Sequence, residues 1–315
     1  MRSKWLALPP LRRGLLTSAF HERKARRAVE EGWTRRLLTP DVQTAEPGLY
    51  VSLTSHGPRF GTLALTLRSL LLQSLRPEAV LLWIGHRDLA GLPDEVRALE
   101  PFGLQIRPCE DHGPYTKYVH ALRERPAGRI AICDDDTYYR PDWLAELVAA
   151  DRPGEIPCHR IHRVALDETG MPEAYRLWQH DSDARDASPL NFPTGVGGVL
   201  LTMERFDPRV VDMNEALALC PTSDDLWLYA TARLAGTCFR LAGPHEPLVV
   251  WRTSQDNALW RTNVAARAND RYIAALVERF GTARLFESTA EVPVARAASG
   301  GGIAATASMA PFGEP

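Results

Sequence analysis

The sequence has no apolar run long enough to span a membrane, and its first residues lack the continuous apolar core and small-residue cleavage site of a secretory signal. It also lacks a strong charge bias, because 37 Lys and Arg residues against 39 Asp and Glu residues leave a formal net charge of −2. A chain without a global basic field is not expected to bind nucleic acid. We therefore expect a protein that does not cross a membrane by itself and has no nucleic-acid partner.

Cysteine is scarce, and its spacing does not indicate structural pairs. The five cysteines are odd in number and contain no Cys-x-x-Cys motif, in a chain of 315 residues that is too long to need disulfides. This usage is typical of a reducing compartment, so a cytoplasmic location is expected. The 45% of hydrophobic residues is enough for a sizeable core, in one large domain or two ordinary ones.

The two ends of the chain differ in composition from the rest. Residues 1–47 read as a basic extension, in which residues 1–40 carry ten Lys and Arg residues against three Glu, with Leu and aromatic residues between them. One interpretation is an amphipathic helix that makes peripheral contact with the inner face of the membrane. The other is a poorly ordered or loosely docked extension, which Pro9-Pro10 favours. Residues 286–315 are predicted to form a flexible tail rich in Ala, Gly and Ser, and we expect no chemistry from either end.

The body of the chain, residues 48–285, alternates predicted strands with predicted helices. Apolar, β-branched runs at 48–54, 79–85, 103–107 and 129–133 are separated by helical stretches, which favours a mainly parallel sheet flanked by helices. After residue 150 the pattern changes. Strand-like pieces at 158–164 and 173–178 suggest a mixed second half, so we predict an α/β, Rossmann-like domain with halves at 48–150 and 151–285.

The most informative stretch is Arg-Ile-Ala-Ile-Cys-Asp-Asp-Asp at residues 129–136, where an apolar run ends in three consecutive carboxylates. The carboxyl end of a strand in an α/β sheet is where ligands bind. Three adjacent aspartates repel one another unless a positive group lies among them, and a hard divalent cation is the simplest such group. An acidic loop leading into the helix that follows Pro141 is the alternative, and the triplet alone leaves both open.

The order of these pieces resembles the nucleotide-sugar-dependent glycosyltransferases with the GT-A fold, closest to the family 2-like members of bacterial carbohydrate pathways. Four stretches spread over residues 48–280 carry the resemblance: YVSLTSHGPRF at 50–60, SLLLQ at 69–73, IAICDDDTY at 130–138 followed by PDWL at 141–144, and TSDDLWL at 222–228 after the glycine-rich segment 195–201. Their order and spacing are more specific than any one of them.

The resemblance implies that the first strand and its loop hold the nucleotide. It carries Ser52, Thr54 and Arg59 onto contacts with ribose, base edge and phosphate, for which hydroxyls and a guanidinium are suited. The alternative is a strand-terminal turn with surface hydroxyls. Lys117 matches a lysine that related sequences carry and would meet the diphosphate or the base, although a lone lysine on a helix usually faces solvent.

The three aspartates match the Asp-x-Asp signature of the same enzymes. By analogy Asp134 lies near the ribose or base and, with Asp136, ligates a Mn²⁺ or Mg²⁺ ion that bridges the diphosphate. Asp135 between them is a second contact with the nucleotide sugar. The cation is required because negative charge grows on the nucleoside diphosphate as the bond to the sugar breaks.

A second acidic pair matches the position that supplies the base in inverting members of the family. An acceptor hydroxyl needs a base within hydrogen-bond reach as it attacks the sugar, and the resemblance assigns this role to Asp225 with Asp224 beside it. The family pair is more often Glu-Asp, so which of the two is the base stays open. Acidic residues in the first turn of a helix also stabilise the helix dipole, by about 0.3–1 kcal/mol each.

Other candidates carry weaker signals. Gly197 and Gly198 would let a ligand or a backbone approach closely, or would form a strand bulge. His245 lies where some family relatives place a further metal ligand. Four tryptophans are candidates for stacking on sugar rings or, as large aromatics usually are, for the core: Trp178, Trp227, Trp251 and Trp260.

The predicted function is a metal-dependent, inverting glycosyltransferase of the hexosyltransferase type, which moves a sugar from a nucleotide-diphosphate sugar to the hydroxyl of a carbohydrate or other acceptor. Bacterial polysaccharide or glycoconjugate synthesis is the expected setting. Two alternatives stay open. A sugar-1-phosphate nucleotidyltransferase would show a Gly-rich loop with Arg and Lys after the first strand, where residues 52–60 offer one Gly and one Arg. A non-catalytic nucleotide- or carbohydrate-binding module is the other.

Overall fold

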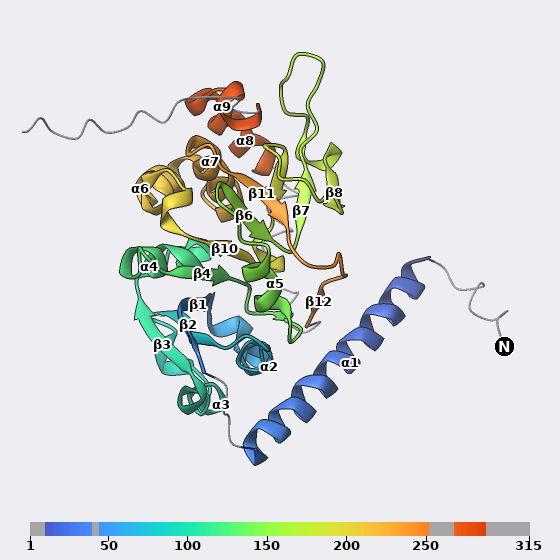
Figure 1. The fold of residues 1–315 in the computed structure, drawn as a ribbon, viewed down its shortest axis with the longest axis vertical. Coiled ribbons are helices and arrows are strands. Elements are labelled where there is room, and N and C mark those ends of the chain that lie inside the picture. The colour runs from blue at the N-terminus through green and yellow to red at the C-terminus, as the bar shows by residue number, and fades with distance from the viewer. Residues whose placement is uncertain (1–9, 40–43, 252–267, 288–315) are drawn as a thin grey trace, which may run out of the picture.

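The computed structural model describes residues 10–39, 44–251 and 268–287, and it is built around a seven-stranded sheet with strand order β11-β6-β10-β4-β1-β2-β3 (Figure 1). All of these strands run parallel except β10, which is antiparallel to both of its neighbours. The strands of the sheet are β1 (Glu46–Ser55), β2 (Pro77–Gly85), β3 (Leu104–Cys109), β4 (Arg129–Ile132), β6 (Glu155–Cys158), β10 (Val199–Leu201) and β11 (Cys238–Leu241).

Helices cover both faces of the sheet, and alternate residues of each strand pack against opposite layers. In β4, Ile130 and Ile132 face one hydrophobic cluster, whereas Ala131 faces the other. The first cluster involves α4 (Thr116–Glu124), α6 (Met213–Leu219), α7 (Asp224–Leu234), α8 (Ala268–Phe280) and α9 (Thr282–Phe286). The second involves α2 (Phe60–Leu71), α3 (Asp94–Arg97) and α5 (Trp143–Ala149). This confirms the predicted α/β class with a mainly parallel, helix-flanked sheet.

The second half of the chain is mixed, as expected, but two of its predicted strands are wrong in detail. The run at 158–164 is split, because β6 ends at Cys158 in the main sheet and β7 (Ile161–Arg163) belongs to a separate antiparallel sheet with β8 (Gln179–Ser182) and β9 (Asn191–Pro193). The run at 173–178 forms a 3₁₀ turn over Tyr175–Leu177 instead of a strand. The buried indole of Trp178 donates a hydrogen bond to the carbonyl of Glu173, which closes this turn.

The basic N-terminal segment forms a long helix, α1 (Pro10–Leu38), which runs along the outside of the body beside α2 and β12 (Figure 1). Ala25, Val29 and Trp33, spaced four residues apart, form a buried stripe on it. Arg36 donates hydrogen bonds to the carbonyls of Leu71 and Phe102. The expectation of a poorly ordered or loosely docked extension is therefore wrong for these residues, since their apolar stripe packs on the body.

No helix among the residues that the structure describes is long and apolar enough to cross a membrane. The bounds of the domain, residues 48–285, and of the tail, residues 286–315, stay predictions.

The strand order determines where a ligand can enter. The chain forms β1, β2 and β3 side by side in one direction and then returns past β1 to form β4. In open α/β sheets such a reversal opens a crevice at the carboxyl ends of the two central strands. Here those ends are Ser55 of β1 and Ile132 of β4, and Asp134–Asp136 follow directly after β4. The short strand β5 (Thr137–Tyr138) comes next and pairs with β12 (Val249–Val250).

Candidate functional site

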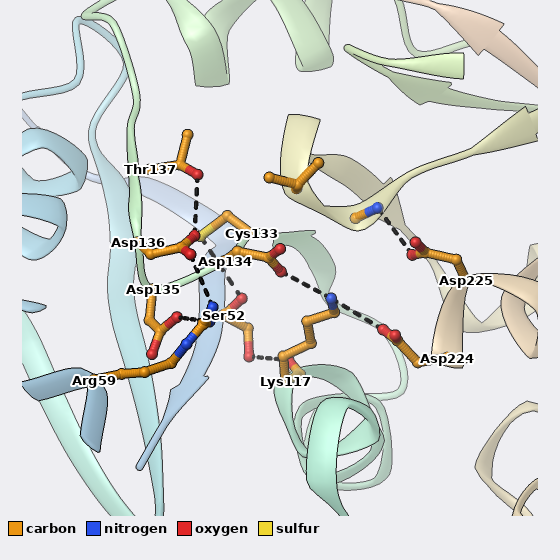
Figure 2. A network of polar contacts seen from close by, with 12 residues as sticks. Ser52, Arg59, Lys117, Cys133, Asp134, Asp135, Asp136, Thr137, Asp224 and Asp225 are labelled. Atoms are coloured by element: carbon orange, nitrogen blue, oxygen red, sulfur yellow. Dashed lines mark hydrogen bonds and ion pairs between the residues drawn. The ribbon is translucent and has the colours of Figure 1, made fainter. Parts of the chain in front are cut away.

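The three aspartates lie at the carboxyl ends of β1 and β4, and Arg59 joins two of them (Figure 2). Its guanidinium donates from Nη1 to Asp135 Oδ1 at 2.6 Å and from Nη2 to Asp136 Oδ2 at 2.9 Å. The hydroxyl of Ser55, the last residue of β1, donates to the other oxygen of Asp135 at 2.6 Å. Asp135 is therefore buried and bonded within the protein, and Arg59 contacts carboxylates in this structure.

Lys117, in the first turn of α4, reaches between Asp134 and Asp224 (Figure 2). Its Nζ lies 2.9 Å from Asp134 Oδ1 and 3.0 Å from Asp224 Oδ2. The side chain is buried, with 7% of its surface exposed, so it does not face solvent as a lone helical lysine usually does. One ammonium group thus connects the aspartates after β4 with the acidic pair that begins α7.

Ser52 holds the backbone of this lysine in place. Its buried hydroxyl donates to the backbone carbonyl of Lys117 at 2.6 Å and accepts from the indole of Trp83 at 2.9 Å. In this structure the Ser52 hydroxyl is enclosed and makes both of these hydrogen bonds, and its predicted nucleotide contact stays a prediction. Thr54, predicted for the same role, donates to the carbonyl of Trp83 at 3.0 Å. Both hydroxyls hold neighbouring backbone in place.

The acidic pair lies in the first turn of α7, opposite the aspartates of β4 (Figure 2). The backbone N–H of Gly195 donates to Asp225 Oδ1 at 2.9 Å. A Cβ at residue 195 would lie 2.7 Å from Lys117 Nζ and 3.0 Å from Asp225 Oδ1, so a side chain there would require these groups or the loop to shift. Asp224 Oδ2 is buried and close to Lys117, but it is not aligned for a hydrogen bond.

The environment raises the pKa of the carboxyl groups in the site. For Asp225, burial and then the negative charge of Asp224 raise the pKa to about 7. For Asp136, burial and then the charge of Asp134 raise the pKa to about 6. Burial alone would lower the pKa of Lys117, but Asp134, Asp224 and Asp225 together raise it well above its usual value. The lysine is therefore charged, whereas Asp225 can exchange a proton near neutral pH.

Among the described residues the charges of the site are unequal, because two cationic side chains, Arg59 and Lys117, face the carboxylates of Asp134–Asp136 and Asp224–Asp225. An anionic diphosphate would be repelled by this excess of negative charge unless a cation accompanied it. Carboxylate oxygens are the donors that Mg²⁺ and Mn²⁺ prefer. Within residues 10–39, 44–251 and 268–287, no three His, Cys, Asp or Glu side chains are arranged to hold an ion alone. The donor set thus fits a cation that takes most of its ligands from phosphate and water.

The weaker candidates lie around this centre. A Cβ at Gly197 would meet the backbone of Arg160, and one at Gly198, whose φ is +104°, would meet the ring of Trp143. Protein groups therefore occupy the space beside both glycines. The Nε2 atom of His245 lies 3.4 Å from Asp181, and its pairing partner is not one of the aspartates of β4.

Three of the four tryptophans that were candidates for sugar stacking belong to the core. Trp178, Trp227 and Trp251 are buried. Trp260 lies outside the described residues.

Sequence reasoning missed several residues that organise the site. Ser55 holds Asp135, and Gly195 holds Asp225. The hydroxyl of Tyr139 accepts from the N–H of Asp134 at 2.9 Å and donates to the carbonyl of Val196 at 3.0 Å, so it ties the aspartate loop to the glycine-rich loop. The glycines at 195–198 were visible as a signal, but nothing in the sequence distinguishes Tyr139 from its neighbour Tyr138.

The fold and the site define an α/β protein with a buried, carboxylate-rich centre at the carboxyl edge of a mainly parallel sheet. No protein-family model matches the sequence, and no curated protein matches it either.

Among solved structures, the chain is similar to the mannosyltransferase PcManGT from Pyrobaculum calidifontis in complex with GDP-Man and Mn²⁺, at 15% identity and a TM-score of 0.46, over 84% of this chain and 74% of that one. TarS from S. aureus in complex with UDP-GlcNAc aligns at 14% identity and a TM-score of 0.41, over 63% of this chain and 56% of that one. The inositol-1-phosphate CTP transferase from T. maritima aligns at 10% identity and a TM-score of 0.40, over 75% and 98%. Similarities this distant carry no conclusion about activity.

Proposed function

We propose that this protein transfers a sugar from a nucleotide-diphosphate sugar to an acceptor hydroxyl. One observation carries the proposal: the buried ammonium of Lys117 pairs with Asp134 after β4 and with Asp224 at the start of α7. Glycosyl transfer needs two functions close together, one that receives a leaving diphosphate and one that removes a proton from an attacking hydroxyl. The aspartates after β4 and the acidic pair of α7, which Lys117 connects, supply candidates for both of these functions.

Asp225 is the proposed general base. Its pKa of about 7 means that the carboxylate is available at neutral pH and is a strong enough base to accept a proton during the reaction. The hydroxyl proton passes to Asp225 while the acceptor oxygen forms its bond to the anomeric carbon. The bond from that carbon to the phosphate oxygen breaks, and its electron pair leaves with the nucleoside diphosphate. A single displacement of this kind inverts the anomeric centre.

Asp136 and Asp134 are the proposed ligands of a Mn²⁺ or Mg²⁺ ion, with diphosphate oxygens and water completing the set. When bound, the cation stabilises the negative charge of the departing diphosphate. Arg59 holds the carboxylates of Asp135 and Asp136 in position and adds positive charge beside them. Lys117 pairs with Asp134, and its charge offsets part of the repulsion between the two acidic groups.

The finer description belongs to the same proposal. We infer a hexosyltransferase of bacterial polysaccharide or glycoconjugate synthesis, related to family 2, that acts in the cytoplasm on a carbohydrate or other hydroxyl acceptor. The cysteines are compatible with a reducing compartment, because all five are free thiols and four of them are buried. The docking of α1, whose buried stripe faces the body, argues against a peripheral membrane contact through residues 1–40.

The test is a thermal-shift and donor-hydrolysis screen with the common nucleotide sugars and nucleoside diphosphates, with and without Mn²⁺ or Mg²⁺. A true ligand raises the melting temperature by stabilising the fold by RT ln(1 + [L]/Kd), and only in the presence of the cation. Asp136→Ala should abolish this shift, whereas Asp183→Ala, an exposed acid remote in sequence, should keep it.

Two outcomes would favour other functions. No shift with any nucleotide would favour a module that binds a different ligand. Release of pyrophosphate from a nucleoside triphosphate and a sugar 1-phosphate would favour a nucleotidyltransferase.

A further inference from the structure

The N-terminal helix reaches the candidate site through a short two-stranded sheet. Strand β5 follows Asp136 directly and pairs with β12, with Thr137 opposite Val250 and Tyr138 opposite Val249. The N–H of Trp251 donates to the carbonyl of Asp136 at 2.8 Å, so the pairing extends to the aspartate itself. Two strands of two residues each are too short to be stable alone. The position of the main chain at Asp136 therefore depends on the contacts that hold β12 in place.

Trp251 provides that support from the end of β12. Its side chain is fully buried, and its indole N–H donates to the hydroxyl of Thr66 in α2 at 2.8 Å. The ring of Tyr138 meets it edge-on, with centroids 6.3 Å apart. The indole thus anchors both strands of the short sheet to the helix behind them.

Helix α1 also contacts this indole. The guanidinium of Arg26 lies over the ring, with Cζ 5.3 Å from the centroid, a geometry that gives a cation–π interaction. Glu22, one turn earlier in α1, pairs with Arg26 at 3.0 Å and fixes its direction. Ala25 and Val29 on either side of Arg26 are buried. The arginine is therefore part of the docked face of α1.

We propose that Arg26 is a positioning residue for the metal- and nucleotide-binding loop, which acts on Asp136 through Trp251. That Asp136 binds a metal and a nucleotide rests on the proposed function, but the contacts that lead from Arg26 through Trp251 to Asp136 do not. In this proposal the basic N-terminal segment has a structural role, because α1 supports Trp251, the main-chain partner of Asp136.

The test compares two adjacent arginines of α1 in the full-length protein. Arg26→Ala removes the cation over Trp251. Arg27→Ala is the matched control, because Arg27 is exposed and forms its ion pair with Glu31 on the same helix, also four residues away. Amide hydrogen exchange is measured without nucleotide in peptides covering residues 134–139 and 247–251, with β2 as an internal reference.

We expect Arg26→Ala to speed exchange in these two peptides about five-fold, which corresponds to losing one cation–π interaction. Arg27→Ala should leave them unchanged, and Arg26→Lys, which keeps a cation, should fall between. Unchanged exchange in Arg26→Ala, or an equal rise in β2, would overturn the proposal. If Arg26→Ala does not fold, Glu22→Gln takes its place, and a smaller rise confined to the same peptides is expected.

A second readout separates this inference from the proposed function. The cation-dependent thermal shift with a nucleoside diphosphate should need about five-fold more nucleotide in Arg26→Ala than in Arg27→Ala. If the unaltered protein shows no such shift while exchange responds as expected, the proposed function fails and the positioning role stands. If the shift occurs and the two variants behave alike in both assays, the positioning role fails and the proposed function stands.

Discussion

The Nζ atom of buried Lys117 lies 2.9 Å from Oδ1 of the half-buried Asp134. The same ammonium lies 3.0 Å from Asp224, which begins a helix 90 residues beyond Asp134. A buried cation between two carboxylates lowers the free energy of bringing them together, and it fixes their separation. The lysine thus determines how the two acidic groups face each other.

Lys117→Met tests this arrangement. Methionine keeps most of the side-chain volume but removes the charge, which leaves Asp134, Asp224 and Asp225 close together without their shared cation. We expect the free energy of unfolding at pH 8 to fall by about 3–5 kcal/mol, the usual cost of breaking a buried ion pair. Urea denaturation measures it.

The control for this prediction is Asp224→Asn combined with Lys117→Met. The double variant removes one of the repelling charges, so it should be more stable than Lys117→Met alone. An equal or lower stability of the double variant would show that repulsion between carboxylates is not the reason for the loss.

Asp225→Asn tests the general base. Asparagine can still accept the hydrogen bond from Gly195, so the local structure and the binding of donor should be retained. Because an amide cannot take the proton of the acceptor, turnover should fall by about 100- to 10,000-fold. Asp94→Asn, which changes an exposed acid in the first turn of α3, is the control for a general effect of helix charge. A variant at Asp225 that keeps most of the rate would place the base elsewhere or indicate a retaining mechanism.

The pH dependence of both rate and stability follows from the raised pKa of Asp225. The reaction needs the carboxylate, so the rate should rise with pH up to about 7 and then level off. The effect of pH on stability has the opposite sign, because stability falls as pH rises. A carboxyl group whose pKa is higher in the folded state than in the unfolded state favours folding when protonated, and that contribution is lost as pH rises through about 7. Asp225→Asn should therefore be more stable than the unaltered protein at pH 8, and the difference should shrink at pH 5.

The first half of the fold could be predicted because its central strands β2 and β4 are buried along most of their length and read as continuous apolar runs between helices. β2 is an example, with all residues from Ala79 to Gly85 buried. The second half could not be predicted to the same extent. β6 and β7 are separated by two residues yet belong to different sheets, and periodicity cannot reveal such a change of partner. The docking of α1 depends on contacts such as Trp33 with Phe102, 69 residues apart, which no local pattern reports.

For the site, the sequence located the acidic groups but not their partners. Asp134–Asp136 and Asp224–Asp225 could be chosen because they end a strand and begin a helix, where ligands and helix charge explain them. The assignment of Lys117 and Arg59 to phosphate contacts rested on the family resemblance and on residue type, and neither tells which of several anions a cation faces. In the structure both cations pair with aspartates. The predicted contact of both cations with the phosphates of a bound nucleotide stays a prediction.

Gly195→Ala tests the contact between the glycine-rich loop and the proposed base. An added Cβ would lie 2.7 Å from Lys117 Nζ and 3.0 Å from Asp225 Oδ1, so the loop or both side chains must shift. We expect a cost of about 1–3 kcal/mol in stability and a loss of about 100-fold in turnover, because a displacement of about 1 Å at a catalytic group has an effect of this size. Gly61→Ala in α2 is the matched control. Its Cβ would meet nothing within 4 Å, and alanine in a helix should raise stability. If Gly195→Ala keeps full turnover, the N–H of Gly195 does not hold Asp225 in its working position.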